Sequence, residues 1–503
     1  MKDERTATRP DPLAIGLDAQ GIKRRTVRGA GATALAQALK FALQFGSQIV
    51  LARLLDPTQF GLVAMVAPVL GLVITLNDFG FGQAIVQRAE IDHRQVSAVF
   101  WLNLAISGAF TLAMAAAAPL VAALYDEPRA LGVTLACASL ILLTSLTVVP
   151  VALLNRQMRF SALASVEVAA MVIGLASGIA AAALGAGYWA LVVMQAVNLA
   201  VVLLLAWRLC GWRPGRPQRE PGIGALMRFG TNLMGANVAS YLTTSADNVI
   251  VGMASGPVAL GLYDRSYNLV VKPLGQLMAP VGRVALPLLS RWLAAPVRYG
   301  RAYVLMVQVS TAACVPGLIA TIACAVPLIG LLLGDKWLPM APIFVWICLG
   351  GMAVPLAAST SWLFITQDRT GEQLRFNMAC AAVSVASFAL GALWGPRGVA
   401  MVAALSYVFV QMPLLAWAAT RRGPVTLGML REGLAPLLFA GAVAAVAAVA
   451  AARLTGVPRS LLIVSVYLAA YGAFALALLA LPAGRRLLAE ARGALASARH
   501  APA

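Results

Sequence analysis

The chain has 503 residues, and its composition excludes a soluble globular protein. Hydrophobic residues make up 61% of the sequence, charged residues only 11%, and the mean hydropathy is +0.84. The net charge of +19 would suit a nucleic-acid-binding protein only if the basic residues formed a binding surface, so their positions along the chain decide what this charge means.

The first 27 residues are polar, contain six basic residues, and lack the short apolar core of a signal peptide. Fourteen apolar stretches follow, each with about the 20 residues that a membrane span needs. They begin near residues 28, 60, 95, 130, 162, 188, 226, 258, 302, 341, 372, 398, 430 and 459. We therefore expect an all-α polytopic membrane protein with about 14 transmembrane helices.

The basic residues follow the topology of these spans. With the N-terminus in the cytoplasm, 28 of the 38 Lys and Arg residues fall in cytoplasmic segments and six in outer loops. This asymmetry is the positive-inside rule, and it predicts two cytoplasmic termini and an even number of spans. The net charge thus reflects topology and contact with membrane lipids, and we expect no nucleic-acid partner.

The sequence repeats after about 200 residues. Residues 48–62 and 248–262 share an apolar segment, a Pro turn (Pro57, Pro257) and a following Gly-Leu pair. Two further pairs of segments match at offsets of 209 and 210, namely residues 124–126 with 333–335 and residues 184–190 with 394–400. We expect two six-helix lobes in parallel pseudo-repeat plus two C-terminal helices, with the substrate bound between the lobes.

The predicted boundaries follow from the spans and the repeat. They are a cytoplasmic tail at 1–27, a six-helix lobe at 28–210, a linker at 211–225, a second six-helix lobe at 226–420, two additional helices at 421–483 and a cytoplasmic tail at 484–503.

Four basic residues lie within or near the edges of predicted spans: Lys40, Arg265, Lys272 and Arg283. An unpaired charge at the centre of a span costs about 2.5–3.5 kcal/mol, so such residues normally face a cavity. On the eighth span, an arc of about 80° contains a polar stripe. This stripe consists of Arg265, Asn268, Lys272, Gln276 and Arg283. Pro273 and Pro280 predict a kink in the same helix.

Two other spans carry similar polar stripes. The stripe on the first span consists of Gln37, Lys40, Gln44 and Gln48, and that on the seventh of Asn232, Ser240, Thr243 and Asp247. These residues either line one hydrated cationic cavity or hydrogen-bond between helices as structural contacts, which is common for Gln, Asn, Ser and Thr in membranes. The cations Lys272 and Arg265 favour the cavity, although Asp264 can pair with Arg265.

Three acidic residues fall inside predicted spans, and each is a candidate for ion coupling or gating. Asp78 is followed by Gly80 and Gly82, which allow the helix to break there, and this favours a gate. Glu167 lies near the cytoplasmic surface, where it can snorkel or pair with Arg159. Asp247 belongs to the polar stripe of the seventh span.

Four segments resemble one known family. They are residues 52–62 (ARLLDPTQFGL), 76–88 (LNDFGFGQAIVQR), 187–190 (GYWA) and 247–252 (DNVIVG). Through them the chain is similar to the polysaccharide transporter (Wzx-like) family of the multidrug/oligosaccharidyl-lipid/polysaccharide (MOP) flippase superfamily, over roughly residues 25 to 420. The resemblance implies a flippase of the bacterial inner membrane that moves an undecaprenyl-diphosphate-linked oligosaccharide to the outer leaflet by alternating access. A polysaccharide polymerase and a chain-length regulator are the expected partners.

The basic stripe suits that substrate, because a lipid diphosphate is an anion that Arg and Lys bind through charge-assisted hydrogen bonds. We expect Lys272, Arg265, Arg283 and Lys40 to form the anion site, and the Gln and Asn residues of the stripes to contact the sugars. Two transporter alternatives stay open. A peptidoglycan lipid II flippase shares fold and substrate charge, whereas a MATE-like drug exporter should have a cavity dominated by carboxylates and aromatics.

A membrane-embedded polymerase or glycosyltransferase is a more distant alternative. The sequence contains only His93 and His500, both at predicted cytoplasmic positions, and no P-loop. Its six cysteines lie almost entirely in apolar segments without CxxC spacing, which indicates core thiols. We therefore expect no catalytic residues, no metal site and no cofactor.

Overall fold

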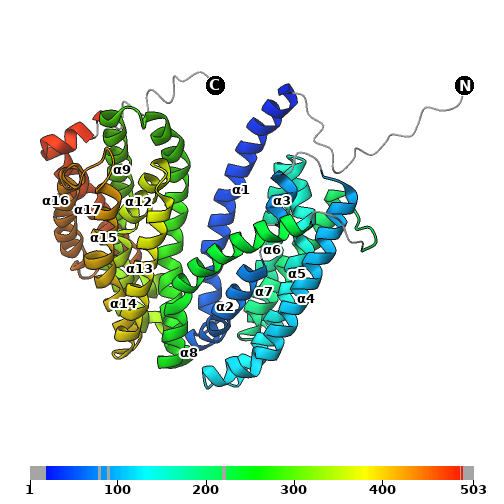
Figure 1. The fold of residues 1–503 in the computed structure, drawn as a ribbon. Coiled ribbons are helices and arrows are strands. Elements are labelled where there is room, and N and C mark those ends of the chain that lie inside the picture. The colour runs from blue at the N-terminus through cyan, green and yellow to red at the C-terminus, as the bar shows by residue number, and fades with distance from the viewer. Residues whose placement is uncertain (1–18, 78–80, 88–90, 218–222, 488, 491–503) are drawn as a thin grey trace, which may run out of the picture. The chain divides into compact units, whose positions relative to one another are not determined.

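A computed structural model describes the backbone of residues 19–77, 81–87, 91–217, 223–487 and 489–490, and every element in these ranges is helical. Side chains at 19–36, 84, 87, 223–240 and 242–244 lie outside the description. The chain divides into two compact units, residues 1–249 and 250–503, which appear in Figure 1 from blue to green and from green to red.

The described residues of unit 1 form seven helices and the first part of an eighth. The seven are α1 (Ala19–Leu54), α2 (Pro57–Asn77), α3 (Phe81–Gln87), α4 (His93–Leu124), α5 (Arg129–Arg156), α6 (Phe160–Ala183) and α7 (Trp189–Cys210). At one end of the unit, Phe100 of α4 packs against Trp207 and Trp212, with ring centroids 5.8 and 5.9 Å apart. The indole nitrogen of Trp101 donates to the carbonyl of Gly215, 2.8 Å away, and so ties the segment after α7 to α4.

Unit 2 contains the rest of α8 (Ile223–Trp292) and the helices that follow. These are α9 (Pro296–Ala323), α10 (Ala325–Leu332), η1 (Asp335–Met340), α11 (Ala341–Gly351), α12 (Val354–Thr366), α13 (Thr370–Ala392), α14 (Gly395–Ser406), η2 (Tyr407–Gln411), α15 (Met412–Thr420), α16 (Leu427–Ala452) and α17 (Arg459–Ala480). The last two helices pack against α9 (Figure 1), and buried alanines such as Ala440 and Ala444 let the backbones approach closely.

Twelve helical stretches in the described part of the chain are long and apolar enough to cross a membrane. They match twelve of the fourteen predicted spans. The other two predicted spans lie in α1 and in the first part of α8, where half and most of the side chains, respectively, are outside the description. The predicted all-α polytopic fold is confirmed. All six cysteines are buried, as expected for core thiols.

Helix α8 is interrupted at a glycine. Gly256 has φ 74° and ψ −175° and is the one non-helical residue of α8, whereas the dihedrals stay helical through Pro273 and Pro280. The kink expected at these two prolines stays a prediction. Gly256 directly precedes Pro257, so it ends one arm (223–255) and begins a second (257–292), as Asp56 and Pro57 do between α1 and α2.

The division between the units falls inside α8, after Val249, whereas the sequence predicted a linker at residues 211–225. The first arm of α8 belongs to unit 1 because it contacts α2 there. The hydroxyl of Tyr241 donates to the carbonyl of Ala67 at 3.1 Å, and a side chain at Gly71 would collide with the Tyr241 ring.

The internal repeat is visible in the geometry of each unit. Arg159 donates to the carbonyl of Leu209 at 2.6 Å, and Arg369, 210 residues later, donates to the carbonyl of Ala419 at 3.0 Å. The residues before these arginines, Met158 and Asp368, have the same left-handed backbone, with φ of 54° and 55°. The offset of 210 read from the sequence thus also relates equivalent helix ends.

Candidate functional site

In unit 1, the basic residue of the α1 stripe forms an ion pair. The Lys40 Nζ atom lies 2.7 Å from the Glu167 Oε2 atom, and the side chains are 24% and 42% exposed. The pair links α1 to α6, which pack side by side. The expected pairing of Glu167 with Arg159 is therefore wrong. The Arg159 guanidinium caps the carbonyl end of α7 instead, because the turn before α6 directs it there.

The other residues of the α1 stripe differ in burial. Gln37 is exposed, whereas Gln44 and Gln48 are partly buried and both have polar partners. The carbonyl of Gln44 also accepts from the Ser47 hydroxyl at 2.7 Å. This arrangement is compatible with contacts between helices and with a hydrated surface, so both interpretations of the stripe remain predictions.

The second arm of α8 distributes its five stripe residues over two environments. Asn268 is buried, at 5% exposure, and so points into unit 2. The Arg265 Nη2 atom forms an ion pair with the Asp264 Oδ2 atom at 2.9 Å. Lys272, Gln276 and Arg283 are exposed. Fewer residues of the predicted stripe are therefore exposed than the sequence suggested, because Asn268 lies on the buried face of the helix.

Lys272 and Arg283 differ from the other two basic residues of the predicted anion site. Within the described part of the chain, neither makes a hydrogen bond or an ion pair. Asp264 and Arg265, about two helical turns earlier, carry opposite charges and pair with each other. Lys272 also lies at least roughly 20 Å from both ends of the second arm, at 1.5 Å per residue. The arrangement therefore leaves an uncompensated cation in the middle of a long apolar helix.

The other two acidic residues predicted for ion coupling or gating are Asp247 and Asp78, and the structure describes only the first. Asp247 is 5% exposed, and one of its carboxylate oxygens accepts a hydrogen bond from the backbone N–H of Asn248 at 2.8 Å. The side-chain oxygen of Asn248 is buried and has no hydrogen-bond partner among the described residues. Asp78 lies outside the described residues, as do the side chains of Asn232, Ser240 and Thr243.

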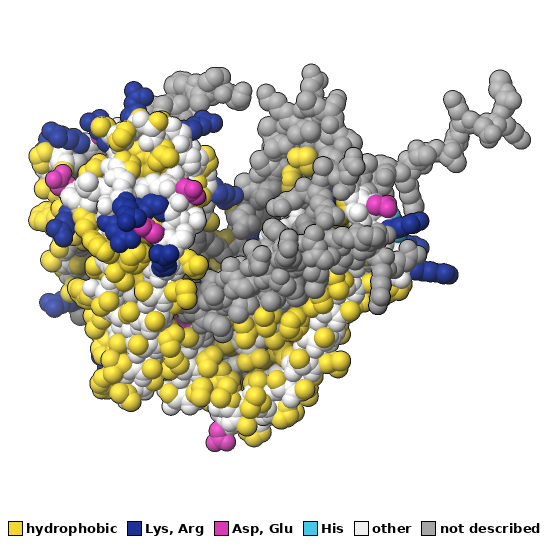
Figure 2. All heavy atoms as spheres, in the orientation of Figure 1, with side chains coloured by type: hydrophobic (Ala, Val, Ile, Leu, Met, Phe, Trp, Pro, Cys, Tyr) yellow, Lys and Arg dark blue, Asp and Glu magenta, His cyan; other side chains and the backbone are white. Residues whose placement is uncertain are grey.

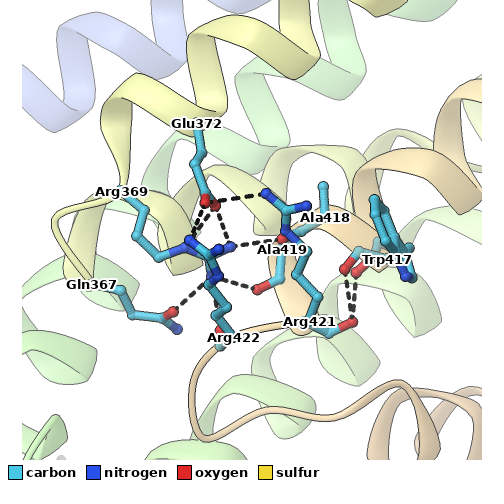
Figure 3. A network of polar contacts seen from close by, with 10 residues as sticks. Gln367, Arg369, Glu372, Trp417, Ala418, Ala419, Arg421 and Arg422 are labelled. Atoms are coloured by element: carbon cyan, nitrogen blue, oxygen red, sulfur yellow. Dashed lines mark hydrogen bonds and ion pairs between the residues drawn. The ribbon is translucent and has the colours of Figure 1, made fainter.

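The structure adds one polar network that the sequence did not predict (Figure 3). The Arg369 guanidinium donates to the carbonyls of Ala418, Ala419 and Arg422 at 2.7–3.0 Å. It also pairs with Glu372, whose other carboxylate oxygen accepts from Arg421 and Arg422 at 3.1 and 2.7 Å. Only the offset of 210 between Arg159 and Arg369 could have signalled the capping part of this network from sequence.

The fold defines the class of protein first. Two solved structures have the same architecture, each at 13% sequence identity. The lipid II flippase MurJ in an inward closed conformation aligns with a TM-score of 0.70, over 88% of this chain and 97% of that one. An inward-facing multidrug resistance MATE transporter of the MOP superfamily aligns with a TM-score of 0.60, over 75% and 93%. The chain therefore has the fold of the MOP transporters.

The sequence then defines the family. The sequence model of the family described as "Polysaccharide biosynthesis protein" matches residues 50–342, more than half of the chain, and the chain belongs to this family. The lipopolysaccharide biosynthesis protein WzxC of Escherichia coli K12 is 23% identical over 404 residues, covering 78% of this chain and 79% of WzxC. The succinoglycan biosynthesis transport protein ExoT of Rhizobium meliloti is 27% identical over 334 residues, covering 66% and 67%. The predicted resemblance to polysaccharide transporters is confirmed.

Proposed function

We propose that this protein is a flippase for lipid-linked oligosaccharides. In this proposal it moves undecaprenyl-diphosphate-linked repeat units from the cytoplasmic to the outer leaflet of the bacterial inner membrane, for exopolysaccharide, capsule or O-antigen synthesis. The family supports a role in polysaccharide biosynthesis, and relatives such as ExoT carry the word transport in their names. The fold supports transport rather than an enzymatic reaction.

The observation that carries the proposal is the unpaired lysine on α8. Lys272 is exposed, and a bare ammonium in an apolar helix is unfavourable unless an anion or water accompanies it. A lipid diphosphate offers several phosphate oxygens that a Lys and an Arg bind through charge-assisted hydrogen bonds. Arg283, about three turns further along the helix, is equally exposed and unpaired in the described part of the chain.

The roles of the remaining candidates follow from this assignment. Lys40 and Arg265 are neutralised by Glu167 and Asp264, so they contribute less to anion binding than Lys272 and Arg283. In this proposal Glu167 and Asp247 stay candidates for ion coupling. A polysaccharide polymerase and a chain-length regulator would act on the repeat units after translocation.

Replacing Lys272 with Ala tests the proposal. In a strain that lacks the chromosomal gene, we expect the Lys272→Ala variant to lose at least nine-tenths of polysaccharide export, because one charge-assisted contact is worth roughly 1.5–3 kcal/mol. Lipid-linked oligosaccharide should accumulate in the inner leaflet. Extracted polysaccharide and labelled lipid-linked oligosaccharide measure the two effects.

Two matched variants show whether charge at this position is responsible. Lys272→Arg retains the cation and should retain most of the export. Arg291→Ala removes an exposed cation from the last turn of the same helix and should export as the unchanged protein does. Normal export by Lys272→Ala, at normal abundance in the membrane, would contradict the proposal.

A further inference from the structure

The arginine network of Figure 3 has hydrogen-bonding capacity left over. Arg369 is saturated, since its donors reach three carbonyls, Gln367 and Glu372. The guanidinium groups of Arg421 and Arg422 each donate only one hydrogen bond within the described part of the chain, both to the same oxygen of Glu372. Each guanidinium has five N–H groups, so most of these donors stay available to a ligand.

The fold does not require Glu372, Arg421 and Arg422. In unit 1 the positions 210 residues earlier hold Ala162, Gly211 and Trp212. Arg159 nevertheless caps α7 there in the same way as Arg369 caps α15. Unit 1 thus forms the equivalent helix end without the extra charges, and the additional arginines of unit 2 need another explanation.

The network lies where membrane spans end. The candidate spans on either side of it finish at Thr366 and Thr420, and another begins at Thr370. In Figure 2, most basic side chains visible on this unit gather toward its upper end, and the surface below is largely hydrophobic. The ends of such spans lie in the headgroup region of a bilayer.

Aromatic and apolar side chains adjoin the arginines. The Cζ atom of Arg421 lies 5.1 Å from the Trp417 ring centroid and 5.2 Å from that of Phe376, so the guanidinium makes cation–π contacts with both rings. Trp417 is 46% exposed, and Leu374 and Met378 of α13 are 58% and 62% exposed. A polar headgroup at the arginines would therefore have apolar surface beside it for its acyl chains.

We propose that Arg421 and Arg422 form a binding site for the phosphate of an anionic phospholipid of the bilayer. The network holds three arginines and one glutamate, a net charge of +2, and this balance stays the same when the exposed neighbours Arg375 and Asp368 are included. A phosphodiester of charge −1, or the two phosphates of a cardiolipin, complements it. Arginine pairs of this kind bind phosphate bidentately. The site is independent of the proposed transport function.

Native mass spectrometry of the purified full-length protein tests the site. Phosphatidylglycerol and cardiolipin are added in turn, with phosphatidylcholine as the zwitterionic reference. We expect the unchanged protein to retain the anionic lipids preferentially, and the double variant Arg421→Gln/Arg422→Gln to bind them roughly tenfold more weakly. If that variant is poorly folded, the single variant Arg422→Gln tests the site instead, because the Arg422 side chain is 70% exposed.

A matched double variant removes the same charge from unit 1. Arg213→Gln/Arg216→Gln changes two exposed arginines of the segment after α7, and lipid binding should stay at the level of the unchanged protein. Equal retention of anionic lipid by the Arg421/Arg422 variant would overturn the proposal, as would an equal loss in the control. Loss of co-purified undecaprenyl-linked lipid without loss of phospholipid would also overturn it, and would assign the cluster to the transported substrate.

Discussion

At the scale of single residues, the charges inside the spans fall into two groups. Lys40 and Arg265 each have a carboxylate within 3 Å, whereas Lys272 and Arg283 have none among the described residues. A paired cation is expected to stabilise helix packing, and an unpaired cation is available to a ligand. The sequence identified all four and the possible pairing of Arg265 with Asp264, but it missed the partner of Lys40, because Lys40 and Glu167 are 127 residues apart.

A double-mutant cycle measures the ion pair between α1 and α6. We expect Lys40→Gln and Glu167→Gln each to lower the free energy of unfolding by about 1 kcal/mol, because each leaves the partner charge uncompensated beside apolar helices. The double variant should recover part of that loss, which gives a favourable coupling energy. Thermal unfolding of the purified protein in detergent provides the values.

The Glu127–Arg129 pair of the same unit is the control for this cycle. Its closest N–O distance is also 2.7 Å, but Glu127 precedes α5, and Arg129, at its first position, is 51% exposed. Salt at about 1 M should weaken the coupling there more than in the Lys40–Glu167 pair, because water and ions screen an exposed pair better. A Lys40–Glu167 coupling energy of zero would show that the two charges do not stabilise each other.

At the scale of elements, the break in α8 depends on one glycine. Gly256 has φ 74° and ψ −175°, a backbone conformation that residues other than glycine rarely adopt. No heavy atom lies within 4 Å of a Cβ built at this position, so strain rather than collision would penalise a substitution. The sequence drew attention to Pro273 and Pro280 instead, because proline is the residue known to kink helices.

We expect Gly256→Ala to lower the free energy of unfolding by about 1–3 kcal/mol, or to shift the bend along the helix. Gly275→Ala is a matched control on the same arm, since Gly275 is helical and also has open space around a new Cβ. It should stabilise the protein by about 0.5–1 kcal/mol, because alanine favours the helix over glycine. The opposite order of the two variants in a thermal unfolding experiment would contradict this role of Gly256.

Helices were easier to predict than helix ends. Apolar stretches of about 20 residues define spans because the bilayer removes every alternative for the backbone, and twelve predicted starts coincide with described spans. The contacts of Arg421 and Arg422 with Glu372 could not be predicted, since these arginines meet the carboxylate only after α13 and α15 pack. The division inside α8 could not be seen in the sequence for a similar reason, because it depends on the contact of Tyr241 with α2, and the predicted lobe boundaries stay a prediction.

At the scale of the whole molecule, the two units share a frame but differ in chemistry. Arg159 and Arg369 cap equivalent helices, yet the position 200 residues before Lys272 is Leu72 and that before Arg265 is Met65. Glu372, Arg421 and Arg422 likewise correspond to uncharged residues of unit 1. Both proposed anion sites therefore depend on residues that unit 2 alone carries, while the repeat accounts for the helices that hold them.

The membrane topology of the repeat is open to a direct test with introduced cysteines. A parallel repeat places residues 210 positions apart on the same side of the membrane. We therefore expect Leu184→Cys and Trp394→Cys, which are exposed and equivalent in the repeat, both to react with a membrane-impermeant maleimide in intact spheroplasts. Arg213→Cys and Arg422→Cys should react only after permeabilisation, because the positive-inside rule places their segments in the cytoplasm.

The unchanged protein is the control for these reactions, because its six native cysteines are buried and should stay unlabelled until it is denatured. Labelling of Leu184→Cys but not Trp394→Cys in spheroplasts would mean that the two units enter the membrane from opposite sides, as in an inverted repeat. The parallel assignment and an even number of spans between the equivalent positions would then both be wrong. Labelling of both outer positions places Arg421 and Arg422, one span after Trp394, at the cytoplasmic surface, where the anionic lipids of the inner leaflet can reach them.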